Sequence, residues 1–223
     1  MAFMSHTIKV STSFGGFQKT LGRVAGGGSL MNVTYTNDSD EEHGYISMTP
    51  DYPGVIFPID MKACPSGQIV CMRDSYLCSM IGMDGSKTDV GVGFNPSSTM
   101  IGRCCAGMDL VAQVLSGGDT AFLMGMGTII SKYLSEGETL LVDTDSILCF
   151  EKSVDISVQY TGGLFAICCS GQGLFNTSLT GPGKIWLQSL SIDKMRTLFQ
   201  PKIITPENIE KGLEVITDSN VMS

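Results

Sequence analysis

Apolar and polar residues alternate with a period of two along much of this 223-residue chain. The alternating runs are short, rich in β-branched and aromatic residues, and mostly bounded by Gly, Pro, Asn, Asp or Ser. They are residues 7–13, 29–35, 54–61, 68–73, 139–143, 146–150, 154–160 and 184–190. Successive side chains of a strand point to opposite faces, so this pattern predicts many short β-strands. A parallel α/β sheet would need helical segments between the strands, and these are missing. We therefore expect an all-β fold, either a sandwich, a barrel or a β-helix-like fold.

Glycine is abundant and charge is scarce. The chain has 27 Gly, and only 16% of its residues are charged, where about 25% is usual for a soluble domain. Hydrophobic residues reach 43%, which is enough to form a sizeable core and excludes a disordered chain. We expect the glycines at strand ends and hairpin turns, and a sheet that buries both of its faces.

The charge balance is acidic, with a formal net charge of −8. This argues against a nucleic-acid partner, because phosphate backbones are bound by Lys and Arg. No apolar run is long enough for a transmembrane segment, and no secretory signal is visible. The first acidic residue is Asp38, preceded by Lys9, Lys19 and Arg23. That start suits either an organellar transit peptide or a glycine-rich strand and loop of the mature fold. We expect an intracellular protein, mitochondrial or cytoplasmic.

An internal repeat is visible in the sequence. The stretch DSYLC at 74–78 matches DSILC at 145–149, and each follows a glycine turn, at Gly67 and Gly137 respectively. We predict a single β-domain over residues 1–200 with two related halves, about 26–80 and 105–150, and a final hairpin at 171–190. A type II turn is expected there, with Pro182 at its second position and Gly183 at its third.

The carboxyl terminus has a helical pattern. Thr205, Pro206 and Glu207 provide an N-cap, a first-turn proline and an acidic first turn. Apolar residues then recur at helical spacing, which predicts a helix over 206–217 within a helical tail at 201–223. Residues 191–199 are compatible with another short helix.

No motif in the sequence carries recognisable chemistry. The spacing of Cys64, Cys71 and Cys78 crosses a glycine turn, so no single element presents all three as metal ligands. Only two histidines are present, His6 and His43, which leaves little for a Cys–His pair or a metal site. The eight cysteines lack a secretory context, so we interpret them as free core thiols, and the single Trp186 as a core anchor. We predict no catalytic residue, no cofactor-binding residue and no metal ligand.

Three segments resemble one known family. They are LSEGETLLVD at 134–143, FEKSV at 150–154 and GQGLFNTSLTGPGKIWLQSL at 171–190, and PGVIFPID at 53–60 agrees in order. Together they resemble the family called altered inheritance of mitochondria, member twenty-four, over about residues 1–200. The resemblance implies a fold similar to the trp RNA-binding attenuation protein, a β-sandwich or double-stranded β-helix built from internal repeats. It implies no established enzymatic activity. It also implies an association with the mitochondrial inner membrane and its organisation. Family members usually have another strand or two before the stretch that matches residues 2–5. Either the start is trimmed here, or a sheet edge is left open for a partner strand.

Three functions follow as hypotheses. The first is a non-enzymatic, self-associating β-domain that acts as a scaffold or assembly factor, a homo-oligomer with protein partners at an open sheet edge or at the C-terminal helix. The second is a small-ligand-binding, cupin-like domain, although cupin metal sites need several histidines. The third is an RNA-binding module, suggested only by the likeness to the attenuation protein and opposed by the acidic charge.

Overall fold

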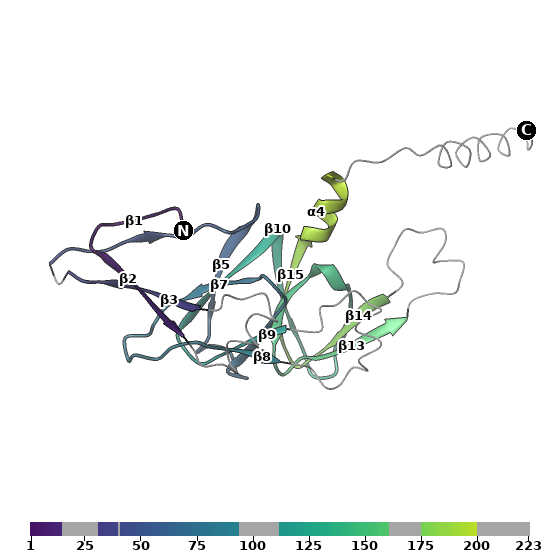
Figure 1. Cartoon of the computed structure of the whole chain (residues 1–223). Helices are drawn as coiled ribbons and strands as arrows, with labels where there is room; N and C mark the ends of the chain where they lie inside the picture. The colour runs from purple at the N-terminus through teal and green to yellow at the C-terminus, as the bar shows by residue number, and fades with distance from the viewer. Residues whose placement is uncertain (15–30, 40, 94–111, 161–174, 200–223) are drawn as a thin grey trace, which may run out of the picture. The chain divides into compact units, whose positions relative to one another are not determined.

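The predicted strands are present in the computed structural model of the chain, which describes residues 1–14, 31–39, 41–93, 112–160 and 175–199 (Figure 1). The chain divides into two compact units, Met1–Ser191 and Ile192–Ser223. The strands are β1 (Phe3–Met4), β2 (Ile8–Phe14), β3 (Met31–Asn37), β4 (Ile46–Ser47), β5 (Val55–Asp60), β6 (Gln68–Cys71), β7 (Tyr76–Ser79), β8 (Asp89–Gly93), β9 (Ala112–Ser116), β10 (Thr120–Leu134), β11 (Thr139–Asp143), β12 (Ile147–Glu151), β13 (Asp155–Tyr160), β14 (Phe175–Thr180) and β15 (Gly183–Leu190). The all-β fold class is therefore confirmed.

The main sheet has eight strands, and every pairing in it is antiparallel. Its order is β5-β10-β15-β12-β6-β9-β8, and β7 also pairs with β10. A second sheet of three strands has the order β11-β14-β13. Two further two-stranded pairs are formed by the amino-terminal strands, β1 with β4 and β2 with β3. In Figure 1, β10 and β15 run side by side through the middle of the first unit.

The centre of the main sheet, at β6 and β12, is buried on both faces, whereas β5 and the second half of β10 are largely exposed. Along β6, Val70 enters one hydrophobic cluster, which we call the first, whereas Ile69 and Cys71 on either side of it enter a second. The first cluster is shared with the three-stranded sheet and includes Val142 and Leu179 from β11 and β14. The second lies between strands of the main sheet itself, which is curled. Strands with two buried faces have few positions for charged side chains, which accounts for the composition.

Trp186 belongs to the second cluster and is 7% exposed, so its assignment as a core anchor is confirmed. The Nζ of Lys184 lies 5.1 Å from the centre of its ring. An ammonium group over an indole face is attracted by the ring electrons. This attraction holds the Lys184 side chain over Trp186.

Strand β10 has 15 residues and changes partners along its length. Its first half pairs with β5 and β7, and its second half pairs with β15. A bulge between Met126 and Ile129 separates the halves, with Gly127 in the left-handed region. The amides freed there donate to side chains instead of the ladder, Met126 to Gln188 at 3.1 Å and Thr128 to Ser189 at 2.9 Å. A bulge thus redirects the strand without leaving buried donors unpaired.

The predicted final hairpin at 171–190 is wrong as a pairing. Strands β14 and β15 are joined by Gly181 and Pro182, but β14 pairs with β11 and β13, and β15 pairs with β10 and β12. Both edges of each strand are therefore occupied by other strands, and the turn carries the chain from one sheet to the other. The type II turn is also wrong, because the Gly181–Pro182 peptide is cis, as in type VI turns.

The repeat stays a prediction. The turn glycines Gly67 and Gly137 both adopt left-handed conformations, as a strand–turn–strand unit requires. However, β5 and β6 share one sheet, whereas β10 and β11 belong to different sheets. Parts of both proposed halves, 26–30 and 105–111, lie outside the described residues.

The second unit begins with helix α4 (Ile192–Phe199), which agrees with the helix expected over 191–199. The helix predicted over 206–217 and the tail at 201–223 lie outside the described residues.

Tyr52 ties the loop before β5 to the main sheet. Its hydroxyl lies 3.1 Å from the carbonyl oxygen of Met124, to which it donates. Burial, followed by the nearby carboxylates of Asp74 and Asp51, raises the pKa of Tyr52 to about 12. The phenol therefore stays protonated, and a donor, throughout the physiological range.

Replacing Tyr52 with phenylalanine is expected to lower the free energy of unfolding by about 1 kcal/mol, because the hydroxyl's hydrogen bond is lost and the Met124 carbonyl loses a donor. Urea denaturation measures the change. Tyr45→Phe is the matched control, since Tyr45 is 62% exposed, and should change stability by less than about 0.5 kcal/mol. Equal effects of the two substitutions would show that the Tyr52 hydrogen bond does not stabilise the fold.

Candidate functional site

Large apolar side chains are exposed in several places on the described surface. The amino-terminal strands expose Phe3, Met4, Val10, Val33 and Tyr45. The segment between β7 and β8 exposes Met80, Ile81 and Met83, and other sites include Val55, Ile130, Tyr133 and Leu141. Single exposed apolar residues are ordinary on a protein surface, whereas grouped ones indicate an interaction site. Among the described residues, the stretch from β1 to β4 holds more of these exposed side chains than any other.

Strands β2 and β3 form a two-stranded antiparallel pair, which we call the amino-terminal ribbon. Its seven-residue register runs from Ile8 opposite Asn37 to Phe14 opposite Met31. The two strands contact each other extensively and have at most a marginal contact with any other described element. Every side chain from Lys9 to Ser13 is exposed, on both faces of β2. Among the described residues, nothing therefore packs across either face of this strand.

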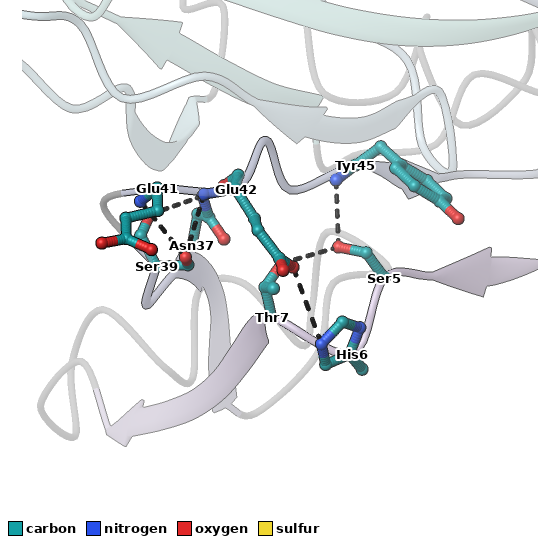
Figure 2. A network of polar contacts seen from close by, with 8 residues as sticks. All are labelled: Ser5, His6, Thr7, Asn37, Ser39, Glu41, Glu42 and Tyr45. Atoms are coloured by element: carbon teal, nitrogen blue, oxygen red, sulfur yellow. Dashed lines mark hydrogen bonds and ion pairs between the residues drawn. The ribbon is translucent and has the colours of Figure 1, made fainter.

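A polar network holds the base of the amino-terminal ribbon (Figure 2). The side-chain amide of Asn37, the last residue of β3, donates to the carbonyl oxygens of Ser39 at 3.0 Å and Glu42 at 2.7 Å. The Ser39 hydroxyl in turn accepts from the amides of Glu41 and Glu42. These bonds close a compact turn, so the chain leaves the ribbon in one defined direction.

The other side of this network connects the ribbon to the pair formed by β1 and β4. The Ser5 hydroxyl accepts from the Tyr45 amide at 3.2 Å and lies 2.9 Å from the Thr7 hydroxyl. His6 Nε2 lies 3.7 Å from a carboxylate oxygen of Glu42, and both side chains are largely exposed (Figure 2). An exposed ion pair contributes little to stability. The base of the ribbon is therefore fixed by the hydrogen bonds between the side chains of Asn37, Ser39 and Ser5 and nearby main-chain groups.

The buried cysteines form a cluster that the sequence spacing did not reveal. Cys71 on β6 and Cys149 on β12 are directly opposite each other, fully buried, and in side-chain hydrogen-bond contact. Burial, followed by the contact with Cys71, raises the pKa of Cys149 well above its ordinary value. A buried neutral thiol is a poor nucleophile. Cys64, Cys71, Cys78 and Cys149 are all free, as expected, and the remaining four cysteines lie outside the described residues.

A carboxylate lies at one end of the second cluster. Glu151 is 4% exposed and raises the pKa of the nearby Cys64 thiol, which burial already shifts and which reaches about 11. Lys184 acts on the same thiol in the opposite direction. Asp60 also raises the pKa of this thiol, so two carboxylates and one ammonium act on a neutral thiol. The arrangement has no base positioned on a nucleophile.

Other charged and polar side chains of the described residues are dispersed. His6 lies at the base of the ribbon, and Glu138 pairs with Lys132 at 2.6 Å beside the Gly137 turn. Gly85 ends a turn that its amide closes by donating to the Gly82 carbonyl at 2.8 Å, and the Gly82 amide donates to the Ser86 carbonyl at 2.9 Å. Residues 171–173 lie outside the described residues. Within the ranges that the structure describes, no three His, Cys, Asp or Glu side chains are grouped so as to hold a metal ion.

The fold defines an all-β domain with a curled antiparallel main sheet. Residues 1–190 match the family model described as Mitochondrial biogenesis AIM24, and the chain belongs to this family. A Streptococcus pyogenes protein solved by X-ray crystallography has a similar fold, with a TM-score of 0.60 and 18% sequence identity. The similarity covers 89% of this chain and 83% of that chain. No curated protein matches the sequence. Across the described residues, no helix has the length and apolar character needed to cross a bilayer.

Proposed function

We propose that this chain is a non-enzymatic, self-associating β-domain that acts as a scaffold or assembly factor in mitochondrial biogenesis. Membership of the Mitochondrial biogenesis AIM24 family supports the process and the mitochondrial location. The observation that supports self-association is the set of exposed apolar side chains on the amino-terminal strands. Covering such a group against another protein removes apolar area from water, at about 25 cal/mol per Å².

The expected result in solution is a homo-oligomer. Size-exclusion chromatography with light scattering should give a mass that is a multiple of 23.8 kDa at micromolar concentration. A mass of one chain throughout that range would overturn the self-association. Tagging in cells tests the location independently, and a signal excluded from mitochondria would overturn that part of the proposal.

The alternative function is a small-ligand-binding, cupin-like domain. The observation that favours it is the buried Glu151 carboxylate near Cys64 and Lys184. Metal analysis of the purified protein, together with thermal-shift measurements with Zn²⁺ and Mn²⁺, tests it. A stoichiometric metal whose binding is lost in Glu151→Gln would support this alternative over the scaffold, whereas metal-free protein with no thermal shift would exclude a metal-binding cupin.

A further inference from the structure

Cys71 and Cys149 face each other across two neighbouring strands of the main sheet. Cys71 ends β6, and it lies directly opposite Cys149 of β12. The Met72 amide donates to the Leu148 carbonyl at 3.0 Å, which joins the residue after Cys71 to the residue before Cys149. The two cysteines therefore occupy a non-hydrogen-bonded pair, where Cα atoms are about 4.5 Å apart and side chains are closest. Disulfides join residues whose Cα atoms are about 4.4 to 6.8 Å apart, so this strand geometry accepts one.

We propose that Cys71 and Cys149 are a disulfide-forming pair, oxidised by a small-molecule disulfide, whose bond links β6 to β12. Both side chains belong to the second hydrophobic cluster, so they lie on the same face of the sheet, and both are 0% exposed. They are in direct contact with each other, as a bridge requires. This pair is independent of the scaffold role proposed above.

The other described cysteines are placed less favourably for a bridge. Cys78 on β7 lies opposite Phe122 of β10 instead of a cysteine. Cys64 lies between β5 and β6, and its sulfur donates to the carbonyl oxygen of Asp60 at 3.4 Å. Cys64 also acts electrostatically on Cys149, but less than Cys71 does, which makes it the competing partner. The strand register aligns only Cys71 with Cys149.

A two-thiolate metal site is the competing chemistry for this pair. Thiols bind metals in their deprotonated form, and an apolar cluster disfavours such charges. Asp60 and Glu151, whose carboxylates act on the neighbouring Cys64, would add negative charge near the thiolates. A disulfide carries no charge and removes two weakly polar S–H groups from the core. The surroundings of the pair therefore favour the disulfide.

The oxidation consists of two thiol–disulfide exchanges. The thiolate of one cysteine attacks a sulfur of the small disulfide, which gives a mixed disulfide and releases one small thiolate. The second cysteine loses its proton, attacks the sulfur of the first and releases the other small thiolate. Two electrons pass to the oxidant, and the two protons end on the two released thiols. Because the folded core buries both cysteines, the exchange takes place before the core closes or when it opens.

A bridge at this position would reinforce a short connection in the main sheet. The pairing of β12 with β6 joins β5-β10-β15-β12 to β6-β9-β8, and its register covers only Ile69 to Cys71 on β6. The bridge closes a loop of about 80 residues, which removes conformational entropy from the unfolded chain. The oxidised protein is therefore expected to melt about 10 °C above the reduced protein.

The experiment refolds the full chain from urea with oxidised glutathione, the small disulfide used as the probe, or with dithiothreitol. Peptide mapping without reduction should recover a Cys71–Cys149 cross-link only from the first sample, and thermal unfolding should show the shift. Cys78→Ala is the matched control and should keep both the cross-link and the shift, whereas Cys71→Ala should lose both. Any bridge among the four cysteines outside the described residues persists in Cys71→Ala, so the difference isolates the proposed bond.

Reduction of the refolded wild type provides a measurement that needs no substitution. Dithiothreitol should break the bridge about tenfold or more slowly in native buffer than in urea, because a buried sulfur is protected from attack. Equal rates would show that the folded core does not enclose the bridge and would overturn the assignment. A Cys64–Cys149 cross-link, glutathione adducts that never resolve, or a bridge that lowers the melting temperature would overturn it as well.

Discussion

Replacing Gly181 with alanine is expected to destabilise the fold by about 3 kcal/mol, in the upper part of the range for overpacking. A Cβ at this position would lie 2.7 Å from the carbonyl oxygen of Leu134 and closer still to that of Ser135. Both are main-chain atoms of a turn that is itself bonded to Gly181, whose amide donates to the Glu138 carbonyl at 2.9 Å. The turn around Gly137 and the turn at Gly181 therefore cannot move apart without disturbing the connection between the two sheets.

Gly137→Ala is the matched control for this prediction, because Gly137 lies in the facing turn. Its φ is +74°, but an added Cβ would meet nothing within 4 Å. Only the left-handed backbone then opposes alanine, at about 1 to 2 kcal/mol. Denaturant unfolding of both variants measures the difference. If Gly181→Ala is no more destabilised than Gly137→Ala, the close packing of the two turns is wrong.

Alkaline pH is expected to destabilise the protein through its buried thiols. Burial raises the pKa of Cys78, and burial with its neighbours raises those of Cys64 and Cys149. In the unfolded chain these thiols ionise from about pH 8.5, whereas in the folded protein they keep their protons. The folded state then binds more protons, so the free energy of unfolding is unaffected below this pH and falls above it. The expected slope is about 1.4 kcal/mol per pH unit for each thiol.

Urea unfolding between pH 8 and pH 10 measures this slope. Cys149→Ala removes one of the shifted thiols and should reduce the loss by about 1.4 kcal/mol per pH unit. Val70→Ala is the control, because Val70 precedes Cys71 on β6 and is also buried, so the substitution destabilises the core without removing a thiol. It should keep the wild-type slope. A slope as steep in Cys149→Ala as in the wild type would contradict protonation of this thiol in the folded state.

The strands could be predicted from the sequence because alternation is a local property. Each predicted run coincides with a strand to within a few residues, from β2 to β15, and the turn glycines Gly67 and Gly137 lie where they were expected. The strands that were not among the predicted runs are β1, β4, β7, β8, β9, β10 and β14. The longest of them is β10. Its pattern is interrupted by Gly125 and Gly127, and its two halves are buried differently because they have different neighbours.

The candidate site was only partly accessible from the sequence. The absence of acidic residues before Asp38 was visible there, and so was the alternation that predicts β2 and β3. That both faces of β2 are exposed could not be seen, because residues such as Val10 and Thr12 are equally common in buried strands. The Cys71–Cys149 contact was missed for a similar reason, since the two residues belong to strands far apart in the chain.

The sequence by itself determined eight of the strands, the positions of the turn glycines Gly67 and Gly137, and that few charges could be buried. Only the tertiary structure decided which strands are neighbours. It showed that β14 and β15, adjacent in the chain, belong to different sheets, and that the amino-terminal ribbon lies outside both clusters. The physical reason is that side-chain alternation depends on a few consecutive residues. Strand pairing depends instead on which arrangement of the whole chain buries both faces at the centre of the main sheet.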